Sequence, residues 1–87
     1  MKVIFKGSFL KAVSKLSGKR LKMRIARTIE DSENAPSVNE LKNFSKLKIF
    51  DDYYRIRMGQ YRIGVKLENH TLVFVAMDIY RIFPLFD

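Results

Sequence analysis

The sequence contains no cysteine and a single histidine. Without cysteine, neither a disulfide framework nor a thiolate metal site can form, and a reducing compartment, the cytoplasm, is the expected setting. The lone histidine, His70, excludes acid–base catalysis by a histidine pair, and its position in a predicted turn favours a loop role. The adjacent carboxylates Asp51 and Asp52 have no evident third ligand, so we predict neither a metal ion nor another cofactor.

Long apolar runs are also missing. The run Val3–Phe5 ends at Lys6 and Gly7, long before a signal-peptide core or a membrane span would be complete, so we expect no contact with a membrane. The 87 residues suffice for one hydrophobic core but not for two, and we expect one domain over residues 1–87. Because a domain of this size is marginally stable, a bound partner would add to its stability.

Acidic residues are absent from the first third of the chain. Residues 1–27 hold nine basic and no acidic residues, whereas residues 28–53 hold three basic and six acidic ones. The whole chain carries a net charge of +8, which attracts polyanions over a distance and predicts binding that weakens as salt is added. Nucleic acid is therefore the expected kind of partner.

The first half of the chain predicts a strand followed by two helices. Val3–Phe5 has the composition of a short strand, and Ser8 is a candidate N-cap for a helix over residues 9–16. Gly18 interrupts this pattern, and residues 19–30 then repeat apolar positions at helical spacing, which predicts a helical hairpin. The second helix carries an arginine stripe on another face, formed by Arg20, Arg24 and Arg27. Such a stripe is most often a solvated face, but it could also contact RNA backbone or an acidic partner.

The second half predicts three strands. Residues 53–67 alternate with a period of two around Gly59–Gln60, which predicts a β-hairpin with a two-residue turn. Asn69–His70 marks a second turn, after which residues 71–77 have the composition of a third strand. These strands follow one another closely, so we expect them to form a meander.

The remaining segments complete an α+β architecture. Residues 31–52 form a weakly patterned connection with one turn of helix near residues 38–41, and Pro84 rules out regular structure to the end of the chain. We therefore expect an N-terminal strand and a two-helix hairpin packed on an antiparallel sheet, which the three-stranded meander completes before a short C-terminal segment.

The hairpin register places basic side chains together on one face of the sheet. With a two-residue turn, Arg57 lies opposite Arg62 and Arg55 opposite Gly64. Two guanidinium groups across a strand pair repel each other by up to about 1 kcal/mol, which selection for stability alone would avoid. Arginine is common at solvated strand positions, but no acidic residue interrupts this face before Glu68, and a planar guanidinium suits phosphate. The face comprises Tyr53, Arg55, Arg57, Arg62 and Lys66.

The third strand adds an apolar row to the same face. Simple alternation places Val73, Val75 and Met77 there, where they would be exposed unless another segment covered them. The C-terminal segment could cover them and would then bring Tyr80 beside the arginines. Its residues could equally serve core packing or contact with a protein partner; they are Ile79, Tyr80, Phe83, Leu85 and Phe86.

Two stretches resemble the RelE/ParE family of bacterial toxins. The first, Tyr54 to Ile63, reads Tyr-Arg-Ile-Arg, a glycine turn and Tyr-Arg-Ile, and the second runs from Asp78 to Pro84. The resemblance implies the toxin of a type II toxin–antitoxin system, which a cognate antitoxin silences in a hetero-oligomer. Many relatives are ribosome-dependent endoribonucleases that cleave mRNA without a metal, through attack of the ribose 2′-OH, and so inhibit translation.

The resemblance also implies roles for single residues. Arg57 and Arg62 would stabilise the charge that builds on the scissile phosphate, and Arg55 would orient this phosphate or assist the leaving 5′-oxygen. Tyr80 would activate the 2′-OH or stack on a base. The further residues expected to contact RNA are Tyr53, Lys66, Arg81, Arg20, Arg24 and Arg27.

One part of the family's pattern is missing. Another arginine usually precedes the C-terminal tyrosine by a few residues, but the residues from Ala76 to Ile79 occupy that stretch here. Arg81 could substitute for it from the other side of Tyr80. Two alternatives therefore stay open: a ParE-type inhibitor of DNA gyrase without an RNA-cleaving site, and a weak or inactive relative that only binds an antitoxin or RNA.

Overall fold

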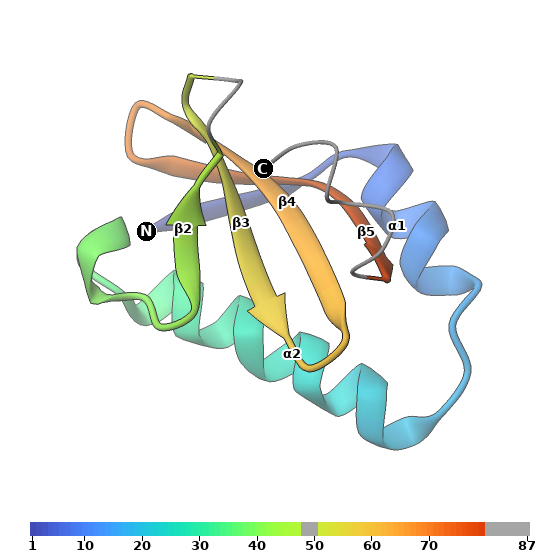
Figure 1. Ribbon diagram of the computed structural model, residues 1–87. Helices are drawn as coiled ribbons and strands as arrows, with labels where there is room; N and C mark the ends of the chain where they lie inside the picture. The colour runs from blue at the N-terminus through green and yellow to red at the C-terminus, as the bar shows by residue number, and fades with distance from the viewer. Residues whose placement is uncertain (48–50, 80–87) are drawn as a thin grey trace.

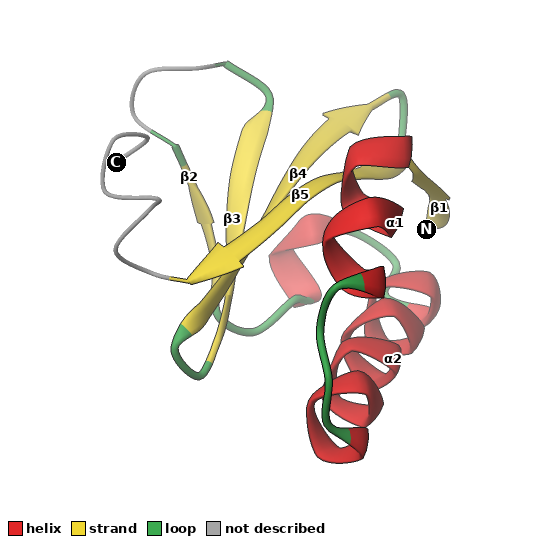
Figure 2. Cartoon of the chain, turned by 90° about the vertical axis from the view of Figure 1, so that its right-hand side faces the viewer, coloured by secondary structure: helices red, strands yellow, loops and turns green. Residues whose placement is uncertain are grey.

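The computed structural model describes residues 1–47 and 51–79, which form a five-stranded sheet with two α-helices beside it (Figure 1). The elements are β1 (Lys2–Phe5), α1 (Gly7–Ser14), α2 (Lys19–Asn34), a short 3-10 helix η1 (Val38–Glu40), β2 (Phe44–Lys46), β3 (Tyr53–Met58), β4 (Tyr61–Glu68) and β5 (Thr71–Ile79). Both α-helices lie on the same side of the sheet (Figure 2). The predicted α+β class, with two helices on one face of a sheet, is confirmed.

The strand order in the sheet is β1-β5-β4-β3-β2. β3, β4 and β5 form the predicted antiparallel meander, with turns at Gly59–Gln60 and Asn69–His70. β1 pairs with β5 in parallel, so that Val3 lies opposite Leu72. The sheet is therefore mixed: one edge is parallel, because β1 and β5 are separated by both helices and three other strands, and a long crossover can bring two strands together in the same direction.

The edge strand β2 was not predicted from the sequence. It pairs with β3 in antiparallel fashion, and Phe44 lies opposite Ile56. The rings of Phe44 and Tyr54 stack with their centroids 4.7 Å apart, a contact that favours the pairing. A strand of three residues is too short to show a period of two, which explains why this segment reads as part of a connection.

The helix boundaries differ from those predicted. Ser8 does not cap α1: its Oγ donates a hydrogen bond of 2.6 Å to the carbonyl of Val75 on β5, and the helix begins at Gly7. The predicted N-cap role is therefore wrong, because the hydroxyl joins the helix to the sheet instead. α2 continues to Asn34, where the amino group of Met1 donates to the Glu33 and Ala35 carbonyls at 2.9 and 2.8 Å. A positive group is favourable at this helix end.

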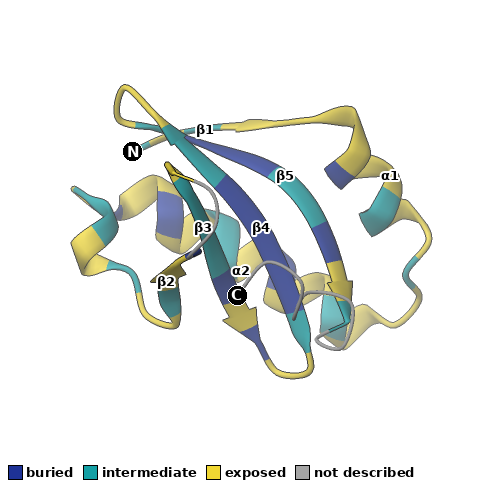
Figure 3. Cartoon of the chain, turned by 45° about the horizontal axis from the view of Figure 1, so that its top comes forward, coloured by how far each residue is buried: buried dark blue, intermediate teal, exposed yellow. Residues whose placement is uncertain are grey.

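The hydrophobic core lies between the helices and the sheet. The predicted inward positions of the hairpin are confirmed, since Ile56, Met58, Ile63 and Val65 are all buried, and Figure 3 shows that burial concentrates along the central strands. Burial of apolar surface is the main force that holds the helices on this face. The buried core cluster comprises Phe9, Ile25, Ile56, Met58, Ile63, Val65, Leu72, Phe74 and Met77. None of the helices in residues 1–47 and 51–79 is long and apolar enough to cross a membrane.

A β-bulge in β5 corrects the predicted faces of that strand. Val65 pairs with Phe74, whereas Gly64 pairs with Ala76, so Val75 is an extra residue in β5. A bulge of one residue reverses the alternation beyond it. Met77 therefore pairs with Ile63 and lies in the core, and its predicted position on the basic face is wrong.

Candidate functional site

The hairpin of β3 and β4 carries the predicted basic face. The alternate residues of these strands lie in the core against the helices, so the basic face is on the other side of the sheet from the helices, whose position Figure 2 shows. The predicted register is confirmed: Arg57 lies opposite Arg62, and Arg55 lies opposite Gly64. Tyr53 pairs with Lys66 at the other end of the hairpin. The hairpin thus brings together five of the residues predicted to act on RNA. We name this group the basic face, and its members are Tyr53, Arg55, Arg57, Arg62 and Lys66.

Arg62 is the buried member of the basic face. Only 8% of the residue is exposed, and its Nη1 donates hydrogen bonds to the carbonyls of Gly59 and Tyr61 at 2.8 and 2.9 Å. These bonds hold the guanidinium against the hairpin turn. Because burial of a charged group is costly without partners, Arg62 is not an ordinary solvated strand residue. Its burial provides a fixed positive charge in a site of reduced dielectric, where such a charge acts most strongly on an anion.

Arg55 and Arg57 have different surroundings. Arg57 is exposed, so its guanidinium is accessible to a ligand. Arg55 is half-buried, and its Nη2 lies 3.4 Å from Ser45 Oγ on β2. The strand that the sequence failed to predict therefore supplies a neighbour to a predicted site residue.

Lys66 forms an ion pair at the far end of the basic face. Its Nζ lies 2.8 Å from Oε1 of Glu68 and 5.6 Å from the ring centroid of Tyr53. The hydrogen bond to Glu68 and the charge of Glu68 raise the pKa of Lys66 above its ordinary value. In return, the same hydrogen bond and the charge of Lys66 lower the pKa of Glu68 below its ordinary value. Glu68 therefore offsets part of the positive charge here, and the arginines dominate the other end.

Asp78 is a residue of the basic face that the sequence pattern missed. It pairs with Arg62 across β4 and β5, is exposed, and its Oδ1 accepts a hydrogen bond of 2.8 Å from the amide of Ile79. Uninterrupted alternation would have placed it on the helix side, and only the bulge at Val75 turns it to the basic face. A carboxylate here reduces the local positive potential.

The three arginines of the α2 stripe have different surroundings in the structure. Arg24 and Arg27 line a hollow of about 280 Å³ at the end of the hairpin, together with Arg57 and Gly59. Arg20 lines neither this hollow nor its larger neighbour. Tyr80 and Arg81 lie outside the residues that the structure describes, so their predicted roles stay predictions.

The guanidinium of Arg24 lies against the hairpin turn at Gly59. Gly59 has a φ of +61°, which residues with a side chain rarely adopt, and a Cβ at this position would lie 3.0 Å from Nη1 of Arg24. Glycine therefore serves both the turn and the approach of the guanidinium.

Replacing Gly59 by alanine is expected to destabilise the fold by about 1–2 kcal/mol, because the new Cβ strains the backbone. A matched control is Gly7→Ala in α1, where no atom lies within 4 Å of the new Cβ and stability should stay equal or rise. Urea denaturation of both variants measures the difference. Equal stability of the two variants would contradict the expected strain at the turn.

Comparison with known proteins identifies the family. No family model matches the chain. Toxin RelE3 of Methanocaldococcus jannaschii is 38% identical over 89 residues, which cover 97% of this chain and 100% of that protein. The RelE structure in a RelB–RelE antitoxin–toxin complex from Methanococcus jannaschii superposes with a TM-score of 0.80 at 30% identity, covering 97% of this chain and 99% of that one.

A more distant solved structure has the same fold. In an archaeal RelE–RelB complex from Pyrococcus horikoshii OT3, the matching chain is 22% identical with a TM-score of 0.73, over 90% of this chain and 92% of that one. The resemblance to the RelE/ParE family, which the sequence showed in two stretches, thus extends over nearly the whole chain in both sequence and fold. The chain belongs to the RelE toxin family.

Proposed function

We propose that this chain is the toxin of a toxin–antitoxin pair and acts as a metal-independent endoribonuclease that cleaves mRNA on the ribosome. The observation that carries the proposal is the pairing of Arg57 with Arg62 across the hairpin. One guanidinium is exposed and the other is buried and held by two backbone carbonyls. This combination suits an anion that arrives from solvent and gains charge as it reacts.

The main requirement of the reaction is positive charge that stabilises the phosphate as it reacts. The ribose 2′-oxygen attacks the adjacent phosphorus, the bond from phosphorus to the 5′-oxygen breaks, and the products carry a 2′,3′-cyclic phosphate and a 5′-OH. A proton leaves the 2′-OH and another reaches the 5′-oxygen. Arg57 and Arg62 would stabilise the charge on the phosphoryl oxygens, and Arg55 would orient the phosphate or support the departing oxygen.

Tyr80 is the residue we assign to the 2′-OH. An unperturbed tyrosine has a pKa near 10, so it is a weak base unless nearby positive charge lowers its pKa. The arginines of the basic face are the groups that would lower it. Arg81 is the candidate to replace the arginine that this chain lacks before the tyrosine.

An antitoxin is the second partner in this proposal. The RelE chains from Methanococcus jannaschii and Pyrococcus horikoshii were solved in complex with RelB antitoxins. A net charge of +8 favours an antitoxin with an acidic segment, because such a segment neutralises the surface that RNA would otherwise occupy.

The test is cleavage of mRNA by the purified chain with programmed ribosomes. Wild-type protein should produce fragments that end in a 2′,3′-cyclic phosphate and a 5′-OH, the products of attack by the ribose 2′-oxygen. Arg57→Ala should slow cleavage about 10²-fold, because a donor to the transition state is lost. Lys19→Ala, which removes an exposed charge on α2, is the matched control and should cleave normally. Intact mRNA with wild-type protein, or normal cleavage by Arg57→Ala, would refute the proposal.

A further inference from the structure

The hollow between α2 and the hairpin turn gathers three arginines from two separate elements. Arg24 and Arg27 come from α2, and Arg57 comes from β3. All three are exposed. Within residues 1–47 and 51–79, no ion pair or side-chain hydrogen bond engages any of these guanidinium groups, although Asp31 lines the same hollow. We name this hollow the arginine groove.

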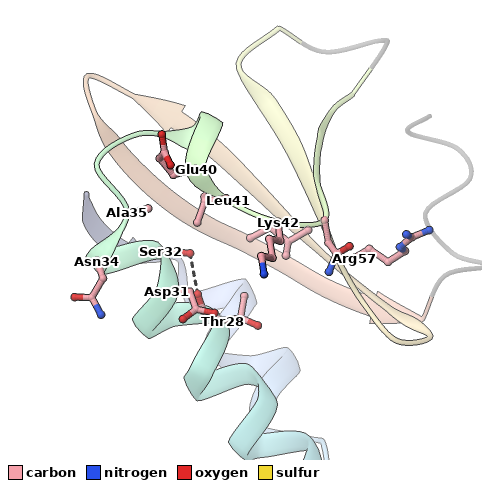
Figure 4. Close-up of a pocket in the computed structure, with 11 residues that line it drawn as sticks. Thr28, Asp31, Ser32, Asn34, Ala35, Glu40, Leu41, Lys42 and Arg57 are labelled. Atoms are coloured by element: carbon pink, nitrogen blue, oxygen red, sulfur yellow. Dashed lines mark hydrogen bonds between the residues drawn. The ribbon is translucent and has the colours of Figure 1, made fainter.

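The arginine groove adjoins a second hollow and the basic face. The second hollow, of about 460 Å³, shares Thr28, Asp31, Asn43 and Arg57 with it. Figure 4 shows this larger hollow along α2, with Arg57 on its strand side and the Arg57 side chain extending away from Thr28 and Ser32. Because Arg57 also stands on the basic face, this residue connects the basic face to the hollows beside α2.

The lining of the arginine groove favours phosphate over a protein segment. An amphipathic helix needs a row of apolar contacts, but Met58 is the one apolar side chain among the lining residues that the structure describes. The remaining lining residues are polar or charged, apart from Gly59. Guanidinium groups offer forked donors that match phosphate oxygens. The volume of about 280 Å³ leaves room for a phosphodiester unit.

We infer that the arginine groove binds the phosphate backbone of single-stranded RNA next to the cleavage site, with Arg24 and Arg27 as its ligands. The inference rests on the proposed function, because Arg57 links the arginine groove to the face where cleavage would occur. RNA that passes over the basic face continues around the hairpin turn onto α2. Gly59 is part of this site, since the absence of a side chain lets Arg24 lie at the turn.

The test measures RNA binding separately from cleavage. The probe is a 12-nucleotide single-stranded RNA with 2′-O-methyl riboses, which cannot attack the phosphate, and fluorescence anisotropy of the full chain is recorded over a range of salt concentrations. The variant is Arg24→Ala/Arg27→Ala. The matched control, Lys19→Ala/Lys22→Ala, removes the same charge from exposed positions on α2 that line neither hollow.

The arginine variant should bind at least about tenfold more weakly, and its slope of log affinity against log salt should fall by about 1.4, or 0.7 for each lost phosphate contact. The control should bind within about threefold of wild type. Equal weakening of both variants, or unchanged binding by the arginine variant, would overturn the inference. Cleavage assays distinguish the two proposals: absence of cleavage by wild-type protein refutes the nuclease proposal and leaves the binding comparison intact.

Discussion

Replacing Arg62 by alanine is expected to reduce mRNA cleavage about 10²–10³-fold, the usual loss when one preorganised donor to a transition-state oxyanion is removed. Arg62 should have a larger effect than the exposed Arg57, because Arg62 is a buried residue whose guanidinium donates to two backbone carbonyls. A charge that is already oriented needs no reorganisation as the phosphate reacts. The measurement is the single-turnover rate with programmed ribosomes.

Loss of stability cannot account for a decrease of this size. Removal of Arg62 leaves the carbonyls of Gly59 and Tyr61 without these donors, which costs about 1–3 kcal/mol. A domain with about 5–15 kcal/mol of stability stays mostly folded after such a loss, and urea denaturation can verify this. Arg62→Lys is the informative control: it keeps the charge but cannot reach both carbonyls with a planar fork, so it should recover only part of the rate. Full activity of Arg62→Lys would show that orientation is unimportant.

The hairpin was predictable because one short turn determines many pairs. Once Gly59–Gln60 is read as a two-residue turn, every opposite pair of β3 and β4 follows, including Arg57 with Arg62. The buried face then follows from alternation alone. Local chemistry thus specified the part of the candidate site that lies on these two strands.

The bulge in β5 was not predictable in the same way. The residues from Leu72 to Met77 are apolar throughout, so no polar residue marks the point where the alternation reverses. The bulge coincides with a contact from elsewhere in the chain, since the carbonyl of Val75 accepts a hydrogen bond from Ser8 of α1. A strand pattern read alone contains no trace of this contact, and it assigns both Met77 and Asp78 to the wrong face.

The burial of Arg62 and the division of the α2 stripe also depend on tertiary structure. Sequence periodicity places Arg20, Arg24 and Arg27 on one helix face and does not distinguish between them. Only the packing of α2 beside the hairpin turn separates Arg24 and Arg27, which line the arginine groove, from Arg20. Sequence patterns therefore identified the charged residues, whereas distances between elements decide which of them can act together.

Replacing Phe74 by alanine is expected to have the largest effect on stability. Phe74 is fully buried, and its ring lies 5.3 Å from that of Phe9 and 5.6 Å from that of Phe5, centroid to centroid. Loss of a buried phenylalanine costs about 3–5 kcal/mol, and each kcal/mol lowers the Tm of a domain of this size by about 4–8 °C. Thermal unfolding should therefore show a decrease of at least about 12 °C.

Phe5→Ala is the matched control, because Phe5 belongs to the same aromatic cluster but is 40% exposed. Its smaller loss of buried area should cost about 1–2 kcal/mol, and equal Tm values for the two variants would contradict the assignment of Phe74 to the centre of the core. Phe74 pairs with Val65 directly beside the bulge, yet it lies on the helix side of the sheet. At a temperature where Phe74→Ala is still folded, RNA cleavage per folded molecule should therefore equal that of wild type. A loss of cleavage by folded Phe74→Ala would mean that core packing around the bulge also sets the position of the arginines on the basic face.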